Sequence, residues 1–178
     1  MFFGCNITSV ASGIRTYWGT DQTDSARLRS LMTRELSGGL NLVIDDASHL
    51  YEPTKRSFEI LFPCVEPSGL YIIEDWAWSL WPEFQAKDHP WADQKPLSKL
   101  VFDLIEVAGS WSSGPKLIES IAVYQGFAAV ERGNVKITDA ENFTLEQCIS
   151  RRPNTPTLNH SLHKLKRSLY RHILWRFR

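Results

Sequence analysis

Leu40-Asn41-Leu42-Val43-Ile44-Asp45-Asp46-Ala47-Ser48-His49 is the stretch that decides the fold, because an apolar run ends there in two acids and a histidine. A second run, Leu70-Tyr71-Ile72-Ile73-Glu74-Asp75, ends in a similar way. Continuous apolar runs of this length are typical of strands that are buried on both faces of a parallel sheet. We therefore predict neighbouring parallel strands over residues 40–44 and 70–73. Their carboxyl ends form the edge at which open α/β sheets bind ligands.

Four carboxylates and one imidazole are expected to meet at this edge. Asp45, Asp46, Glu74 and Asp75 would repel one another there unless protons or a cation neutralised them, and His49 stands beside them. A hard cation that prefers oxygen ligands, such as Mg²⁺, is the simplest solution. The competing explanation is that these are ordinary turn and capping residues, since Asp and Ser favour such positions.

Length and composition indicate one folded domain with a basic C-terminal segment. The chain has 178 residues, of which 43% are hydrophobic, and its formal charge is zero. Residues 151–178 carry eight Lys and Arg and no Asp or Glu, which leaves 12 basic beside 20 acidic residues in 1–150. We predict an α/β domain over 1–150, followed over 151–178 by a basic amphipathic helix with apolar positions at Leu162, Leu165 and Leu169.

Three roles are open for that helix. It could pack its apolar face on the domain, bind an anionic membrane surface or bind nucleic acid, and packing is favoured. No nucleic-acid recognition motif occurs in the sequence, so no nucleic-acid partner is expected.

The cysteines and the N-terminus favour a cytoplasmic protein. Cys5, Cys64 and Cys148 show neither a Cys-x-x-Cys pair nor a metal-ligand spacing, so free thiols are expected. The N-terminus lacks the positive charge and the long apolar stretch of a signal peptide. No run of about 18 apolar residues offers a membrane span.

The remaining elements complete an α/β order. Strands are predicted over residues 2–7 and 14–18, helices over 26–36, 53–62 and 97–111, and a turn at Pro67-Ser68-Gly69. Residues 118–124 and 127–132 are predicted to form an antiparallel hairpin at one sheet edge. Residues 76–96 contain four tryptophans and are too long for an idle connection, which predicts a lid or a substrate wall. Alternatively, these tryptophans simply bury apolar area.

This order of elements, with its acidic strand ends, resembles the later part of a class I S-adenosylmethionine-dependent methyltransferase. More narrowly, Val43-Ile44-Asp45-Asp46-Ala47-Ser48-His49 and Pro67-Ser68-Gly69-Leu70-Tyr71-Ile72-Ile73-Glu74-Asp75 resemble the metal-dependent sugar O-methyltransferases of macrolide biosynthesis, which are related to the cephalosporin hydroxylase-like family. The resemblance runs from about residue 4 to residue 133. It implies a Rossmann-like methyltransferase sheet, mostly parallel, with a C-terminal antiparallel hairpin.

The resemblance also implies a catalytic metal site. In that family the first metal ligand stands three residues before the catalytic histidine, and the other two ligands are a Glu-Asp pair after the next strand. These positions match Asp46, Glu74 and Asp75, with His49 as the general base. The implied reaction is the methylation of a hydroxyl on a sugar or small natural product, with Mg²⁺ lowering the pKa of that hydroxyl.

The implied methyl donor is S-adenosylmethionine. Asp21, Gln22 and Asp45 resemble positions that line its pocket in the family. Asn6 stands where the family has an acid that holds the ribose hydroxyls, and an amide can still hydrogen-bond a hydroxyl.

One feature of the family is missing from the sequence. No Gly-x-Gly-x-Gly pattern, which would form the opening glycine-rich turn, occurs anywhere in the chain. We therefore expect an N-terminally incomplete sheet, whose unpaired strands close the gap or lead to a homo-oligomer. The alternative to an active methyltransferase is a catalytically inactive, truncated module of this fold that serves binding or assembly.

Overall fold

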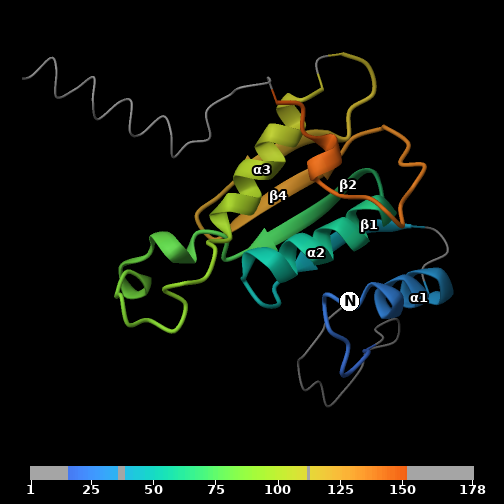
Figure 1. Cartoon of the computed structure of the whole chain (residues 1–178). Helices are drawn as coiled ribbons and strands as arrows, with labels where there is room; N and C mark the ends of the chain where they lie inside the picture. The colour runs from blue at the N-terminus through green and yellow to red at the C-terminus, as the bar shows by residue number, and fades with distance from the viewer. Residues whose placement is uncertain (1–15, 36–38, 112, 152–178) are drawn as a thin grey trace, which may run out of the picture.

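A computed structural model describes residues 16–35, 39–111 and 113–151, in which a four-stranded sheet packs against helices (Figure 1). The helices are α1 (Ser25–Glu35), α2 (Tyr51–Leu61) and α3 (Ser98–Gly109), and the strands are β1 (Leu40–Asp45), β2 (Val65–Glu74), β3 (Ile118–Val123) and β4 (Phe127–Arg132). The order in the sheet is β1-β2-β4-β3. β1 and β2 are parallel, and β4 runs antiparallel between β2 and β3, so three of the four strands share one direction. The predicted α/β class with a C-terminal antiparallel hairpin is confirmed, in a mixed sheet of which one of the three strand pairings is parallel.

The core lies between the sheet and its helices. α2 and α3 lie over one face of the sheet, and α1 packs against α2 (Figure 1). Fully buried side chains come from all these layers: Leu28 and Leu31 of α1, Phe58 and Ile60 of α2, Leu100 and Leu104 of α3, and Tyr71, Ile73 and Val130 of the sheet. The helical apolar spacing in the sequence therefore marks the faces that pack inward.

The opposite face of the sheet is open in the described part of the chain. Leu42 and Ile44 of β1 are 49% and 47% exposed, and Leu70 of β2 is 37% exposed. The prediction that both apolar runs are buried on both faces is therefore wrong. Successive strand residues point to opposite faces, and α2 and α3 both cover the same one.

β2 begins earlier than predicted. Pro67-Ser68-Gly69 lies inside the strand and is not a turn before it. Ser68 has a φ of 66°, and the pairing register with β1 shifts between Leu40 and Leu42. The predicted turn is therefore an irregularity within the strand, in which extra residues of β2 are accommodated by left-handed backbone.

Two other predictions at the N-terminal side have different outcomes. Residues 16–18 are not in a strand, so the prediction of a strand over 14–18 is wrong over its described part. The chain turns there through Gly19, at a φ of 64°, and leads into α1. The predicted strand over 2–7 and the predicted basic helix after residue 151 lie outside the described residues.

Cys64 and Cys148 are free, as expected, while Cys5 lies outside the described residues. None of the helices in the described ranges has the length and apolar character that crossing a membrane requires.

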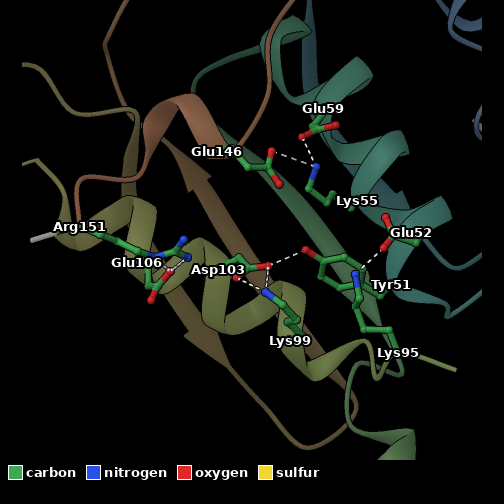
Figure 2. A network of polar contacts seen from close by, with 10 residues as sticks. All are labelled: Tyr51, Glu52, Lys55, Glu59, Lys95, Lys99, Asp103, Glu106, Glu146 and Arg151. Carbon is green, nitrogen blue, oxygen red and sulfur yellow. Dashed lines mark hydrogen bonds and ion pairs between the residues drawn. The ribbon is translucent and has the colours of Figure 1, made fainter. Parts of the chain in front are cut away.

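Polar contacts fix the first turn of α2, which directly follows the predicted site (Figure 2). The hydroxyl of Tyr51 donates to Asp103 Oδ2 of α3 at 2.7 Å. Further along α2, Glu59 is 4% exposed and accepts hydrogen bonds from Lys55 Nζ at 2.6 Å and from the backbone N–H of Leu145 at 3.0 Å. α2 is thus tied both to α3 and to the segment that precedes the C-terminal region.

Candidate functional site

The acids predicted to meet do lie at neighbouring strand tips. β1 and β2 are paired in parallel register, with Ile44 opposite Ile72 and Asp45 opposite Ile73. Asp46 directly follows β1, and Glu74 is the last residue of β2, so both lie at the carboxyl edge of the sheet. This is the edge where open α/β sheets bind ligands.

His49 faces Asp46 across a tight turn. Its Nε2 lies 3.6 Å from Asp46 Oδ1, and the two side chains are 23% and 57% exposed. The φ of His49 is 54°, in the left-handed region, which is uncommon for residues other than glycine. The Nδ1 atom of His49 is buried without a hydrogen-bond partner among the described residues. A residue held in a sparsely populated backbone conformation beside acids is typical of a functional turn.

Asp75 has the same unusual backbone conformation. Its φ is 49°, so two of the three non-glycine residues with positive φ in the described ranges are predicted site residues. The N–H of Asp75 donates to the carbonyl of Gly126 in the β3–β4 turn at 2.7 Å. The next residue, Trp76, donates from its indole Nε1 to the carbonyl of Tyr124 at 2.8 Å. The tip of β2 is therefore fixed to the turn of the hairpin.

Glu74 is electrostatically coupled to the other predicted site residues. Partial burial raises the pKa of the Glu74 carboxyl, the negative charges of Asp46 and Asp75 raise it further, and His49 lowers it. Asp46, His49 and Asp75 thus each lie within electrostatic reach of Glu74. A divalent cation would relieve the repulsion that raises this pKa.

The carboxyl of Asp45 lies on the helix-covered side of β1. The hydroxyl of Tyr71 donates to Asp45 Oδ2 at 2.7 Å, and Ser57 Oγ of α2 lies 3.1 Å from the same hydroxyl. Burial raises the pKa of Asp45, although hydrogen bonds from Tyr71 and Ser57 oppose this shift. Asp45 therefore holds the tip of β1 to β2 and α2, and its role in lining a cofactor pocket stays a prediction.

The other predicted cofactor residues lie before α1. Asp21 Oδ1 accepts hydrogen bonds from both the backbone N–H and the hydroxyl of Thr23, each at 2.7 Å, which lower the pKa of Asp21. The Nε2 atom of Gln22 is buried without a hydrogen-bond partner in the described part of the chain. Asn6 lies outside the described residues.

Trp78 is one of the four tryptophans in the predicted lid or substrate wall, but its contact with the turn of His49 was not predicted. It is 3% exposed, and its indole Nε1 donates to the carbonyl oxygen of His49 at 2.7 Å. Its ring packs against Trp91 and Phe84, with centroids 5.0 and 5.4 Å away. These three rings also line part of a pocket of about 540 Å³, which is open to solvent. The density of tryptophan in 76–96 is the signal that points to this segment.

The fit of a metal rests on the chemistry of the donors. Within the ranges that the structure describes, no three His, Cys, Asp or Glu side chains are close enough together to hold an ion. The donor set nevertheless suits Mg²⁺, because Asp46, Glu74 and Asp75 supply carboxylate oxygens whose charges already interact. The side chain of Asp46 is 57% exposed, and exposed side chains change rotamer within nanoseconds. Asp46 can therefore turn toward an ion that binds at this edge.

Comparison with known proteins identifies relatives of one kind. No protein-family model matches the chain. It is 35% identical over 130 residues to mycinamicin VI 2''-O-methyltransferase of Micromonospora griseorubida, a match that covers 67% of this chain and 32% of that enzyme. It is 33% identical over 123 residues to demethylmacrocin O-methyltransferase of Streptomyces fradiae, covering 64% of this chain and 31% of that enzyme.

Among solved structures, the chain resembles MycE methyltransferase from the mycinamycin biosynthetic pathway in complex with Mg, SAH and mycinamycin VI. The identity is 28%, the match covers 85% of this chain and 37% of that chain, and the TM-score is 0.49.

The chain spans about one third of the length of the curated relatives it matches. Their names agree with the family predicted from the two acidic motifs. Over the matched residues, the chain is therefore similar to these two O-methyltransferases.

Proposed function

We propose that this chain carries the catalytic site of an S-adenosylmethionine-dependent, divalent-metal-assisted O-methyltransferase. The acceptor is a hydroxyl on a sugar or small natural product. The observation that carries the proposal is the 3.6 Å approach of His49 Nε2 to Asp46 Oδ1 at the strand edge where Glu74 and Asp75 also lie. The names of the curated relatives, which are O-methyltransferases, support the same type of reaction.

In this proposal the three carboxylates hold the metal and the imidazole moves the proton. Asp46, Glu74 and Asp75 would hold Mg²⁺, since hard cations prefer oxygen ligands. His49 Nε2 accepts the proton of the acceptor hydroxyl, and its approach to Asp46 directs it toward the same site. Mg²⁺ supplies a lowered hydroxyl pKa, and S-adenosylmethionine supplies the methyl group.

The residues that would bind the methyl donor are Asp21, Gln22, Asp45 and Asn6, as the family resemblance implies. The buried and unpartnered Nε2 of Gln22 supports this assignment, because a buried donor without a partner is costly. We further expect a cytoplasmic protein, with its catalytic domain ending near residue 150.

A second candidate is a catalytically inactive module of the same fold that serves binding or assembly. It is favoured by the open sheet face at Leu42, Ile44 and Leu70, since contiguous exposed apolar side chains are typical of contact surfaces. This candidate predicts oligomers in light scattering and no methyl transfer.

Calorimetry separates the two candidates. The chain is titrated with MgCl₂ and then with S-adenosylmethionine, alongside a Glu74→Gln variant and a matched Glu119→Gln control on the exposed part of β3. The proposal expects Mg²⁺ binding in the wild type and in the control, and its loss in Glu74→Gln. Absence of S-adenosylmethionine binding at saturating concentration would remove the methyltransferase function from this chain.

A further inference from the structure

Two aromatic rings next to the acids are exposed and lie outside the hydrophobic core. Tyr124 is 55% exposed and Phe127 is 36% exposed, although both rings are large and apolar. Their centroids are 4.6 Å apart with an interplanar angle of 27°, so they stack. An exposed apolar patch of this kind is informative, whereas single exposed apolar residues are common.

The position of this pair is fixed relative to the acids. Phe127 is the direct cross-strand partner of Glu74 in the antiparallel pairing of β2 with β4. Directly opposed residues project from the same face of a sheet, with Cβ atoms about 5 Å apart. Glu74 in turn lies beside the tip of β1, so the row across the sheet edge runs from Asp46 through Glu74 to Phe127.

The turn that carries the pair is tied to the tip of β2 by hydrogen bonds. The N–H of Asp75 donates to Gly126 at 2.7 Å, and the indole of Trp76 donates to the carbonyl of Tyr124 at 2.8 Å. Within the turn, the N–H of Tyr124 donates to the carbonyl of Phe127 at 2.8 Å. The rings are therefore held on rigid backbone, as a preformed binding surface requires.

We propose that Tyr124 and Phe127 form an aromatic platform that binds the apolar ring face of the acceptor and so presents its hydroxyl to the acids and to His49. This inference rests on the proposed methyltransferase function and names the residues that select its acceptor. The ligand class is a hydroxylated ring with one C–H face, such as a deoxysugar. Ligand sites combine such apolar surfaces with a few polar groups, and the phenol hydroxyl of Tyr124 is one polar group on the platform itself.

The test uses the full chain with Mg²⁺, S-adenosylmethionine and two probes, mycinamicin VI and demethylmacrocin. The variants are Tyr124→Ala, Phe127→Ala, the double variant and the conservative Phe127→Trp. The matched control is Phe102→Ala, which removes a phenyl ring that is 63% exposed on α3. We expect each alanine variant to raise the KM for the acceptor about tenfold, with kcat and the Kd for S-adenosylmethionine unchanged. The KM of Phe127→Trp for the acceptor should stay near that of the wild type, because an aromatic ring is kept. The control Phe102→Ala should also have the KM of the wild type.

Direct binding of the probes keeps this test independent of turnover. If the wild type binds a probe but does not methylate it, the proposed function fails, while tenfold weaker binding to the double variant still supports the platform. Equal binding or equal KM in all variants overturns the platform. Absence of binding of both probes to the wild type overturns it as well. A change of oligomeric state in the alanine variants, seen by light scattering, would show that the rings contact another copy of the chain and would also overturn it.

Discussion

The indole Nε1 of Trp78 donates a hydrogen bond to the carbonyl oxygen of His49 at 2.7 Å. This bond joins the tryptophan-rich segment to the turn that carries the proposed general base. Because Trp78 is 3% exposed and packs against Trp91 and Phe84, the aromatic cluster and the histidine turn form one unit.

Trp78→Phe should loosen this unit while keeping a ring in the cluster. We expect a stability loss of about 1 kcal/mol, the net value of a typical hydrogen bond. We expect kcat to fall roughly tenfold to a hundredfold, because small displacements of a catalytic group are costly. Hydrogen exchange at the backbone amides of residues 47–50 should become faster, whereas Trp81→Phe in the same segment should leave these rates unchanged. Unchanged exchange in Trp78→Phe would mean that the bond does not order the turn.

His49→Asn separates the backbone role of this residue from its chemical role. Asparagine tolerates the left-handed conformation that His49 adopts at a φ of 54°, so the free energy of unfolding should stay within about 0.5 kcal/mol of the wild type. Methyl transfer should fall by about 10²–10⁴, the usual contribution of a general base. His49→Val should instead destabilise the fold by about 1–2 kcal/mol, because a branched side chain clashes in this conformation. Urea unfolding and a methyl-transfer assay measure both effects, and an active His49→Asn variant would exclude His49 as the base.

The sequence predicts the acidic edge well because the signal there is local. An apolar run that ends in acids predicts both a strand and the side chains that follow it, and the pairing of Asp45 with Ile73 confirms that the two tips are neighbours. The hairpin over β3 and β4 is predicted for the same reason, since its two strands are adjacent in sequence.

Contacts between distant residues were not predictable in the same way. The bond from Trp78 to His49 spans 29 residues, and that from Tyr71 to Asp45 spans 26, so no local pattern encodes either. The exposure of Leu42 and Ile44 depends on which face the helices cover, and an apolar run does not carry that information. The burial of Asp45 also shows that two adjacent acids at the end of a strand point to opposite faces of the sheet. The number of carboxylates in the sequence does not reveal this difference.

Tyr71→Phe tests the buried link between the tip of β1 and its neighbours. The variant removes the hydroxyl that donates to Asp45 and leaves that 6% exposed carboxylate without this partner. We expect a stability loss of about 1–3 kcal/mol in urea unfolding, the cost of a buried polar group that loses its partner. Tyr124→Phe, which removes an exposed hydroxyl, should stay within about 0.5 kcal/mol. Equal effects of the two substitutions would show that the Tyr71 hydroxyl does not stabilise Asp45.

Lys55→Met should be among the most destabilising substitutions on α2. Lys55 Nζ lies 2.6 Å from Glu59 and 3.2 Å from Glu146, and the side chain of Glu59 is 5% exposed. Burial disfavours the charged form of Lys55, but these two carboxylates more than offset it and raise its pKa. Removing the cation leaves the buried Glu59 charge uncompensated, with an expected cost of about 3–5 kcal/mol.

Two further variants check the cause of that loss. Lys116→Met breaks an exposed pair with Glu119, in which both side chains are nearly half exposed, and should cost less than about 1 kcal/mol. Adding Glu59→Gln to Lys55→Met should recover part of the stability, because a neutral amide can still accept the hydrogen bond from the Leu145 N–H. If the double variant is no more stable than Lys55→Met alone, the loss comes from the packing of the lysine stem and not from the unpaired charge.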